Sequence, residues 1–168
     1  MNRFSVCFVC TGNICRSPMA ETVFRQIAER SGHGDHIEVT SAGTGDWHVG
    51  EGADPRTVEA LRRRGYDGSR HRAKQFEADD FGRYDLVVVF DRGHERILRA
   101  WAGDDADRSK VQLLLSFDQE AAAAAGGTDV PDPYYSDAAM FDSVLDLVER
   151  ASSSLFTQIE PALRQGRA

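Results

Sequence analysis

Short apolar runs alternate with amphipathic segments along most of the chain. Residues 4–9 and 86–90 are mostly apolar and predict buried strands. Apolar and polar side chains alternate at residues 37–41, which predicts a strand with one buried face, and residues 111–115 predict a fourth strand. A glycine-rich stretch after the second of these strands indicates a loop.

Helices are predicted between and after these strands. The first has Ser17 as its N-cap, followed by a proline, and it ends before Gly32. The second begins at Asp54, again with a proline next, and ends before Gly65. A third helix follows the third strand, and the last begins near Ser136. The apolar positions of these two are Ile97, Leu98 and Trp101, then Phe141, Val144, Leu145, Val148, Leu155 and Ile159.

This order of elements predicts an α/β fold. Strands that are separated by helices pair in parallel, which here gives a four-stranded parallel sheet flanked by helices. The length of 168 residues fits a single domain over residues 1–168. The sequence leaves the secondary structure of two segments undecided. Serines at 152–154 weaken the middle of the last helix, and the alanine-rich residues 121–127 fit either a frayed helix end or a mobile loop.

The composition argues against several classes of protein. Hydrophobic residues make up 41% and charged residues 28%, which are ordinary values for a globular fold. The net charge of −7 argues against general nucleic-acid binding, which needs a basic surface. No apolar run reaches the ~20 residues of a membrane helix, and residues 1–10 lack the features of a signal peptide. We expect a cytoplasmic protein that binds neither nucleic acid nor membrane, with export by a route without a signal peptide left open.

The cysteines cluster near the start of the sequence. Cys7, Cys10 and Cys15 are too few for a disulfide scaffold, and reduced thiols are expected in the cytoplasm. Cys7 lies inside the first predicted strand, so we expect it to be inert packing. The other two lie in the loop between this strand and the first helix.

That loop, residues 10–17, has the features of an anion site. In an open α/β sheet, ligands bind beyond the carboxyl ends of the strands. A short loop entering a helix N-terminus turns backbone N–H groups inward, and these donors and the helix dipole favour an anion. Gly12 allows close approach of the backbone, and Arg16 supplies a planar fork for two phosphate oxygens. The same positive field stabilises a thiolate at Cys10, which is then placed for in-line attack on phosphorus.

The spacing within the loop is more specific. Five residues separate Cys10 from Arg16 and Ser17 follows, as in the phosphate loop of cysteine-dependent phosphatases. This spacing alone is weak because it recurs by chance, but here it follows a strand, precedes a capped helix and contains Gly12 and Asn13. The alternative makes Cys10 a small buried hydrophobe and Arg16 a surface charge, and it is disfavoured.

At this point the sequence resembles the low-molecular-weight protein tyrosine phosphatases, and their bacterial members in particular. The matching stretches occur in the family's order over most of the chain, at residues 9–21, 41–44, 47–50, 54–56, 71–73 and 132–135. The resemblance implies a four-stranded parallel sheet with flanking helices and a phosphate-binding loop after the first strand. It also implies hydrolysis of phosphotyrosine in proteins, with no metal and no cofactor.

The resemblance implies a role for each matching residue. Cys10 would be the nucleophile, Arg16 would bind the phosphoryl group, and Asp132 would protonate the leaving phenol and then activate water. The other residues around the phosphate would be Thr11, Gly12, Asn13, Ile14, Cys15 and Ser17. The network that shapes the loop and assists the thiolate would consist of Asn13, Ser17, Ser41 and His71. Asp91 matches a position that supports the loop, although a helix cap explains Asp91 equally well.

The acid role of Asp132 is also chemically reasonable. A phenol has a pKa of about 10, so the phenolate leaves more readily when a proton is supplied. A carboxyl group near a thiolate and a phosphate lies in a negative field, which favours its protonated form. Asp132 and Pro133 alone fit a simple turn, but the phosphate loop and the adjacent tyrosines favour the acid.

Aromatic residues predict the walls of the substrate pocket. An aromatic substrate side chain needs a deep apolar slot. Trp47 and His48 lie in the glycine-rich loop, and Tyr134 and Tyr135 follow Asp132; the matching family positions line the mouth of the cleft. The alternative makes Trp47 a core residue and the tyrosines turn packing. Family members can be phosphorylated at the tyrosine pair, which makes a tyrosine kinase a candidate partner.

Three further groups of residues have both a functional and a structural explanation. Cys10 and Cys15 could form a reversible disulfide that protects the nucleophile, as in family members with this pair; the alternative is a passive Cys15. His33 and His36 have no further ligand nearby in the sequence, so a solvated loop is preferred to a metal site. The arginines at 62–64 are predicted to form an exposed helix face.

Three alternatives to a tyrosine phosphatase share this fold or this loop. Arsenate reductases of this fold use a relay of further cysteines, and none follows Cys15. Arginine phosphatases carry a smaller polar residue where this chain has Ile14, and the bulkier side chain fits the tyrosine branch. A catalytically dead phosphotyrosine-binding module would be expected to lose Cys10, Arg16 or Asp132, and all are present. We therefore expect a protein tyrosine phosphatase.

Overall fold

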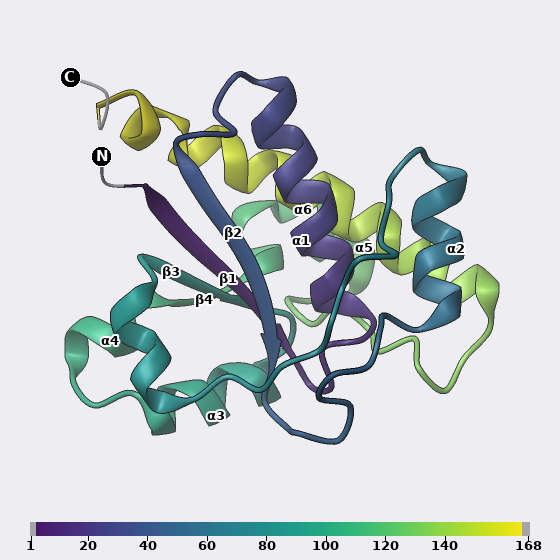
Figure 1. Cartoon of the computed structure of the whole chain (residues 1–168), viewed down its shortest axis with the longest axis horizontal. Helices are drawn as coiled ribbons and strands as arrows, with labels where there is room; N and C mark the ends of the chain where they lie inside the picture. The colour runs from purple at the N-terminus through teal and green to yellow at the C-terminus, as the bar shows by residue number, and fades with distance from the viewer. Residues whose placement is uncertain (1–2, 166–168) are drawn as a thin grey trace.

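The computed structural model describes residues 3–165 and builds them around a parallel sheet. Its strands are β1 (Phe4–Cys10), β2 (Ile37–Gly43), β3 (Leu86–Val89) and β4 (Val111–Leu113), in the order β2-β1-β3-β4 (Figure 1). Each of the pairings β1–β2, β1–β3 and β3–β4 is parallel, so the predicted four-stranded sheet is confirmed. Residues 1–2 and 166–168 lie outside the described residues. They include both ends of the predicted domain and the start of the segment that was tested for a signal peptide.

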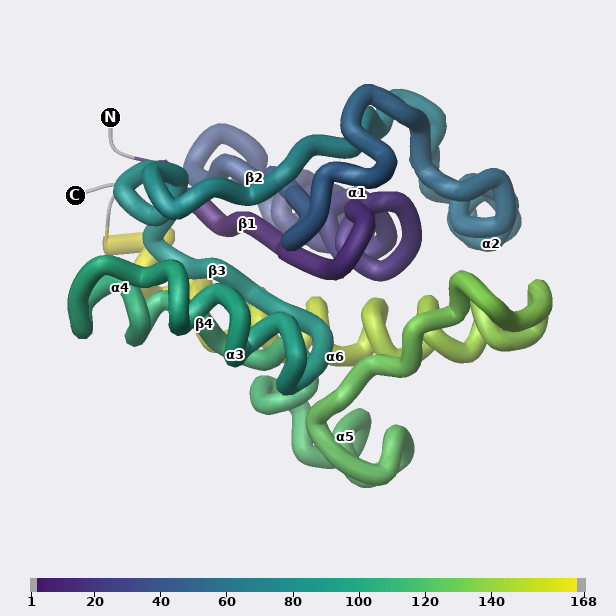
Figure 2. Tube along the Cα trace, turned by 90° about the horizontal axis from the view of Figure 1, so that it is seen from below, coloured from purple at the N-terminus to yellow at the C-terminus, as the bar shows by residue number. Residues whose placement is uncertain are grey.

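Helices flank the sheet on both faces, as predicted. The long helices α1 (Arg16–Arg30) and α6 (Ala138–Gln165) pack against each other on one face. The other face carries α3 (Arg92–Trp101) and α4 (Asp105–Lys110), which Figure 2 shows together at a distance from α1. The remaining helices are α2 (Pro55–Arg63), α5 (Gln119–Ala125) and two short 3-10 helices at Ala78–Arg83 and Leu114–Phe117.

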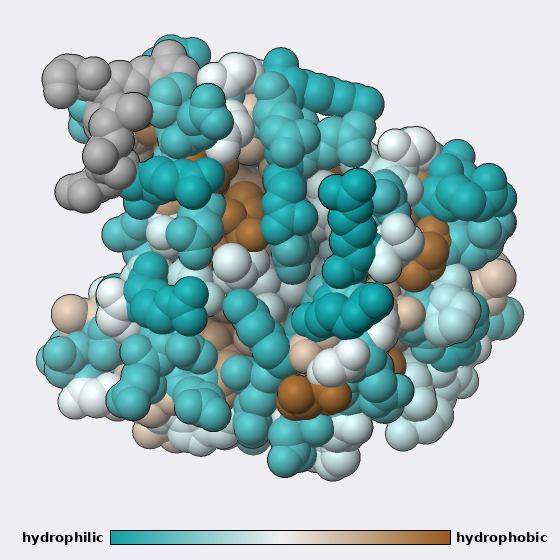
Figure 3. Space-filling model, in the orientation of Figure 1, coloured by the Kyte–Doolittle hydropathy of each residue, from teal (hydrophilic) through white to brown (hydrophobic). Residues whose placement is uncertain are grey.

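The central strand β1 is buried on both faces. Successive side chains of a strand point to opposite sides of the sheet. Val6 and Phe8 therefore join the core beneath α1 and α6, whereas Cys7 and Val9 join the core beneath α3. This double burial explains the nearly continuous apolar run of β1. On the face seen in Figure 3, hydrophilic side chains predominate, with apolar side chains exposed in small separate areas.

The register of the strands places their carboxyl ends together. Cys10, the last residue of β1, lies opposite Gly43, the last residue of β2. Val9 lies opposite Val89 at the end of β3. The loops that leave these strand ends therefore share one edge of the sheet, where ligands bind in open α/β folds.

The N-cap predicted at Ser17 is wrong. Helix α1 begins at Arg16, its N-cap position is Cys15, and that residue makes no side-chain capping bond. The Ser17 hydroxyl lies within hydrogen-bond distance of the Cys10 sulfur and the Asn13 amide instead. By contrast, Asp54 caps α2 as predicted, because its side chain accepts from the backbone N–H two residues further on.

The strand ends differ from the prediction. Strands β1 and β2 run on to Cys10 and Gly43, one and two residues past their predicted ends, whereas the other two strands stop early. The fourth strand stops at Leu113, because Leu114 and Leu115 are both buried and form a 3-10 turn rather than alternating between faces. The third strand stops at Val89, one residue short of the predicted end, with Phe90 buried just beyond it.

The two ambiguous segments are both helical. Helix α6 continues through residues 152–154, because Ser152 is buried and the Ser154 hydroxyl donates to Asp118. The alanine-rich segment forms α5, which ends where Gly126 takes a left-handed conformation with φ of 77°. Neither α4 nor the 3-10 helix Ala78–Arg83 was expected from the hydrophobic pattern, because both are short and mostly exposed.

Two side-chain expectations need correction. His33 is not in a solvated loop: it is buried, its ring lies 5.9 Å from that of Phe156, and its Nε2 faces Glu160 at 3.4 Å. Arg64 is not simply part of an exposed face, because it pairs with two carboxylates of α6 and so ties α2 to that helix. Between residues 3 and 165, no helix combines the length and apolar character needed to span a bilayer.

Candidate active site

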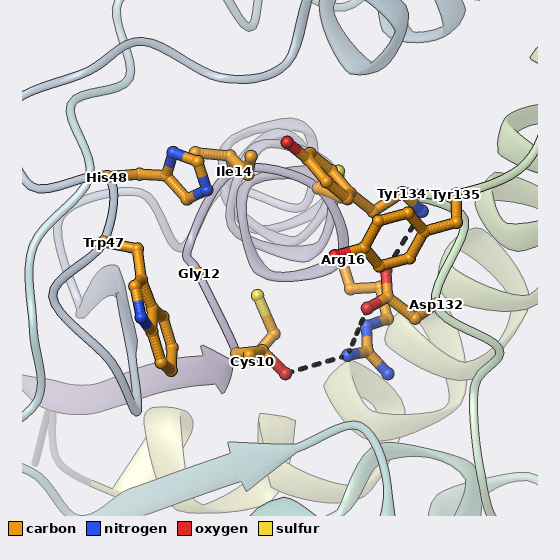
Figure 4. A pocket seen from close by; sticks show the side chains of 11 residues that line it. Cys10, Gly12, Ile14, Arg16, Trp47, His48, Asp132, Tyr134 and Tyr135 are labelled. Atoms are coloured by element: carbon orange, nitrogen blue, oxygen red, sulfur yellow. Dashed lines mark hydrogen bonds and ion pairs between the residues drawn. The ribbon is translucent and has the colours of Figure 1, made fainter.

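The loop between β1 and α1 wraps around the sulfur of Cys10. Asn13 takes a left-handed backbone conformation with φ of 59°, which turns the chain back on itself before α1 begins. Gly43 at the end of β2 allows the loop to lie close, because a Cβ there would come within 2.8 Å of the Thr11 carbonyl oxygen. Cys10 is 3% exposed, at the base of a pocket (Figure 4).

The Cys10 sulfur has a polar partner at the start of α1. Its Sγ lies 2.9 Å from the Ser17 Oγ. The Asn13 side-chain amide donates to the same Ser17 oxygen at 2.7 Å. With that oxygen accepting from Asn13, the Ser17 proton can go to the sulfur, which is nearer than its other acceptor, the Ala42 carbonyl at 3.4 Å. A hydroxyl that donates to sulfur stabilises its anionic form.

Asn13 is fixed from several sides. Its side-chain amide also donates to the Ser41 Oγ at 3.0 Å, and its Oδ1 accepts from the Lys74 backbone at 3.0 Å. The His71 Nε2 lies 2.6 Å from the Asn13 carbonyl oxygen. Burial lowers the pKa of His71, so at neutral pH the ring is uncharged and its Nε2–H can donate to that carbonyl.

Glu21 completes this network and was not identified as a site residue from the sequence. The Ser41 hydroxyl donates to Glu21 Oε1 at 2.5 Å, and the same oxygen lies 4.0 Å from the His71 Nδ1. The only signal in the sequence was its place at the end of the stretch 9–21 that carries the resemblance. Besides its ion pair with Arg25 on the same helix, Glu21 contacts β2 and the segment after α2, which a local pattern does not bring together.

Arg16 is buried and held in one orientation. Its side chain is 3% exposed. Its Nη1 donates to Asp91 Oδ2 at 2.9 Å and to the Val130 carbonyl at 3.0 Å, and its Nη2 lies 3.3 Å from the Thr11 hydroxyl. A guanidinium fixed on one side in this way keeps its other donors oriented toward the pocket.

Asp91 makes two kinds of contact, one with the start of α3 and one with Arg16. One carboxylate oxygen caps α3 by accepting from the His94 backbone N–H at 2.9 Å, and the other binds Arg16. Burial raises the pKa of Asp91, but His94 and Arg16 together outweigh it and hold the pKa below its ordinary value. Asp91 is therefore an anion at neutral pH, as a partner for a buried arginine should be.

His94 is a second residue that sequence reasoning missed. It is 3% exposed, and its Nε2 lies 2.9 Å from the Thr11 hydroxyl and 3.4 Å from the Arg16 Nη2. Burial and the neighbouring Arg16 lower its pKa to about 4, so the ring is neutral at pH 7. A histidine in the first turn of a helix gives no sequence signal for this, because it resembles a surface residue.

The pKa of His94 predicts a loss of stability in acid. The unfolded chain binds this proton near pH 6.5 and the native protein only near pH 4, so the contribution to stability is complete above pH 6.5 and falls as the pH drops toward 4. Between pH 7.5 and 4.5 we expect this single group to cost about 2 kcal/mol. Urea unfolding of the native protein and of His94→Gln at both pH values measures it. Equal acid sensitivity of the two proteins would contradict this explanation.

Asp132 lies on the opposite side of the pocket from Trp47 (Figure 4). Its Oδ2 is 3.6 Å from the Arg16 Nη2, and its Oδ1 accepts from the Tyr134 backbone N–H at 3.1 Å. The side chain is 44% exposed, so it can exchange protons with solvent. A carboxyl group beside the anion-binding guanidinium can deliver a proton to a group bound there.

The pocket has a volume of about 380 Å³ and aromatic walls. Its lining consists entirely of residues marked from the sequence: Cys10, Thr11, Gly12, Ile14, Cys15, Arg16, Trp47, His48, Asp132, Tyr134 and Tyr135. Trp47 is 67% exposed and Tyr135 93%, so neither is a core residue. The marked residues outside the lining are Asn13, Ser17, Ser41, His71 and Asp91, which contact the loop or Arg16.

The two remaining cysteines are poorly suited to ionise. Burial raises the pKa of Cys7 and of Cys15 to about 12. Cys7 faces the core beneath α3, away from the pocket, in agreement with the packing role predicted for it. Within the part of the chain that the structure describes, no group of three His, Cys, Asp or Glu side chains is arranged to hold a metal ion.

Comparisons with known proteins agree with this geometry. The model of the family described as low molecular weight phosphotyrosine protein phosphatase matches residues 5–165. A low molecular weight protein-tyrosine-phosphatase of Streptomyces coelicolor is 52% identical over 165 residues, covering 98% of each chain. The crystal structure of YfkJ from Bacillus subtilis has a TM-score of 0.87 at 35% identity, covering 96% of this chain and 98% of that one. A structure described as the YwlE arginine phosphatase has a TM-score of 0.80 at 30% identity, covering 94% and 96%.

Proposed function

Because this chain belongs to the family of low molecular weight phosphotyrosine protein phosphatases, we propose that it hydrolyses phosphotyrosine in proteins through a phosphocysteine intermediate. One observation carries the proposal. The Cys10 sulfur, the Arg16 guanidinium and the Asp132 carboxylate line a single pocket that has aromatic walls. Together they supply a nucleophile, an anion-binding fork and a proton donor.

In the first step, the Cys10 thiolate attacks phosphorus and the bond from phosphorus to the phenolic oxygen breaks. Asp132, in its acid form, gives its proton to that oxygen, so the substrate leaves as neutral tyrosine. Arg16 binds the oxygens of the phosphoryl group while it passes between sulfur and oxygen, because its donors are fixed by Asp91 and Val130. We expect the backbone N–H groups of the loop to bind the same oxygens.

In the second step, a water molecule attacks the phosphocysteine. The Asp132 carboxylate takes a proton from this water, the sulfur–phosphorus bond breaks, and inorganic phosphate forms. The Ser17 hydroxyl, 2.9 Å from the sulfur, stabilises the thiolate that leaves. The YwlE structure supports a covalent step by analogy, since it is described as a Cys-to-Ser mutant with a phosphorylated active-site serine.

The walls of the pocket support an aryl phosphate as the substrate. Trp47 and Tyr134 present rings on two sides of the space above Cys10 (Figure 4). Ile14 adds an apolar contact to the lining, where a phenol ring gains more than a charged guanidinium would. The arginine phosphatase alternative is less favoured on this ground. Relay cysteines of an arsenate reductase are absent from the sequence after Cys15.

Phosphate release from a phosphotyrosine peptide and from a phosphoarginine peptide of the same sequence tests the substrate. We expect faster release from phosphotyrosine, by at least about tenfold, because an apolar contact of this size is worth ~1–3 kcal/mol. Ile14→Thr should narrow this preference, because it removes apolar contact and adds a hydroxyl. Faster release from phosphoarginine by the native protein would keep the cysteine mechanism but overturn the choice of substrate.

The proposal extends to where the protein acts and how it is regulated. We assign the whole chain to a single phosphatase domain acting in the cytoplasm on tyrosine-phosphorylated proteins. Tyr135, which is 93% exposed, is open to modification by a tyrosine kinase, and Tyr134 beside it is half-buried. A disulfide between Cys10 and Cys15 would block the nucleophile reversibly, because both thiols are free and lie in the same loop.

A further inference from the structure

Arg56, in the first turn of α2, reaches across to the segment that carries Asp132. Its Nη2 donates to the Tyr134 carbonyl at 2.9 Å, and its Nη1 donates to the Ser136 carbonyl at 2.9 Å. Two donors of one planar group thus hold two carbonyls of the same short segment. A guanidinium binds paired acceptors with defined geometry, which a flexible ammonium does not.

Arg56 is itself held in place. The Asp54 carboxylate accepts from its Nε at 3.0 Å, its Nη2 at 2.9 Å and its backbone N–H at 2.8 Å. The guanidinium carbon lies 4.5 Å from the centre of the Phe141 ring of α6. Burial raises the pKa of Asp54, but the hydrogen bonds and charge of Arg56 outweigh it and hold the pKa below its ordinary value. The pair is therefore ionised at neutral pH.

Asp54 links this pair to the phosphate loop. Its backbone N–H donates to the Ile14 carbonyl at 2.9 Å. A continuous path of hydrogen bonds therefore runs from Ile14 through Asp54 and Arg56 to Tyr134. This path joins the loop that holds the phosphate to the far side of the segment that holds the acid.

The Tyr134 backbone links Arg56 to Asp132. The Tyr134 carbonyl accepts from Arg56, and its backbone N–H donates to Asp132 Oδ1 at 3.1 Å. Nearer the N-terminus, the segment is fixed at Val130, which bonds to Phe90 and to Arg16 through its backbone. The exposed Asp132 side chain lies between the Val130 anchor and the Arg56 anchor.

We propose that Arg56 is a positioning residue for the acid step, which orients the Asp132 carboxyl over the pocket by holding the carbonyls of Tyr134 and Ser136. This role rests on the proposed phosphatase function. Loss of Arg56 should impair proton delivery to the leaving group, and phosphate binding by residues 10–17 should change little.

The test compares aryl phosphates whose leaving phenols differ in acidity. In Arg56→Ala, kcat/KM should fall by about 10–100-fold for phenyl phosphate and by less than about 3-fold for a dinitrophenyl phosphate, which needs no proton. Arg56→Lys keeps the charge but loses the fork, so it should recover only part of the loss. Arg62→Ala on the same helix is the matched control, because Arg62 pairs with Glu59 at the surface, and it should match the native protein.

A second background separates positioning from general damage. With Asp132→Asn already present, adding Arg56→Ala should lower kcat/KM for phenyl phosphate by less than about 2-fold, because the acid is already gone. Equal losses for all leaving groups, or an undiminished loss in the Asp132→Asn background, would overturn the proposal. Such losses would be expected if Arg56 acted through the Tyr134 ring, whose centre lies 5.8 Å from the guanidinium carbon, or through stability alone. Native protein that released no phosphate from any ester would instead contradict the phosphatase function.

Discussion

Replacing Cys10 with serine is expected to lower phosphate release from a phosphotyrosine peptide by roughly 10⁴-fold or more, as for loss of a nucleophile in general. The hydroxyl is a much weaker nucleophile than a thiolate, and the Ser17 hydroxyl 2.9 Å away is suited to stabilising an anionic sulfur. Binding should survive, because Arg16 and the loop backbone are untouched. Steady-state phosphate release and calorimetric titration with the same peptide measure the two effects separately.

Cys7→Ala serves as the control for this experiment. Cys7 also lies in β1, but it faces the core beneath α3, and burial raises its pKa to about 12. This variant should therefore keep its kcat even if the small cavity lowers its melting temperature. Full turnover by Cys10→Ser would contradict a phosphocysteine intermediate. Loss of both turnover and binding would show instead that the loop had collapsed.

The sequence predicts local features of this molecule well. The buried strand β1 could be recognised because both of its faces are apolar, and the loop after it because Cys10 and Arg16 have a defined spacing. Ser17 shows the limit of such reasoning. A serine before a proline has the chemistry of a helix cap, and only the folded loop reveals that its hydroxyl lies beside the Cys10 sulfur.

Residues that act through distant partners were the ones that the sequence did not reveal. Glu21, His94 and Arg56 each contact segments that are far from them along the chain. Their residue types are common on helix surfaces, so neither periodicity nor spacing distinguishes them. For Asp91 the sequence offers two alternative roles, a helix cap and support of the phosphate loop. In the folded protein one carboxylate oxygen caps α3 and the other binds Arg16, so the two contacts occur together.

Asparagine at position 132 is expected to slow the enzyme in proportion to how much the leaving group needs a proton. For phenyl phosphate, kcat/KM should fall by about 10³-fold, within the usual range for general acid catalysis. For a dinitrophenyl phosphate it should fall by no more than about tenfold, because that phenolate leaves without protonation. The amide can still accept from the Tyr134 backbone N–H, so the segment should keep its conformation.

The slope of kcat/KM against leaving-group acidity decides the role of Asp132, because this parameter reports the step in which the phenol departs. A steep slope in Asp132→Asn and a shallow one in the native protein mean that Asp132 supplies the proton. Parallel slopes would remove Asp132 from the acid role and leave it as a partner of Arg16, which it approaches at 3.6 Å. An Asp129→Asn variant is a matched control, because Asp129 binds Arg92 at the surface and should leave the native slope unchanged.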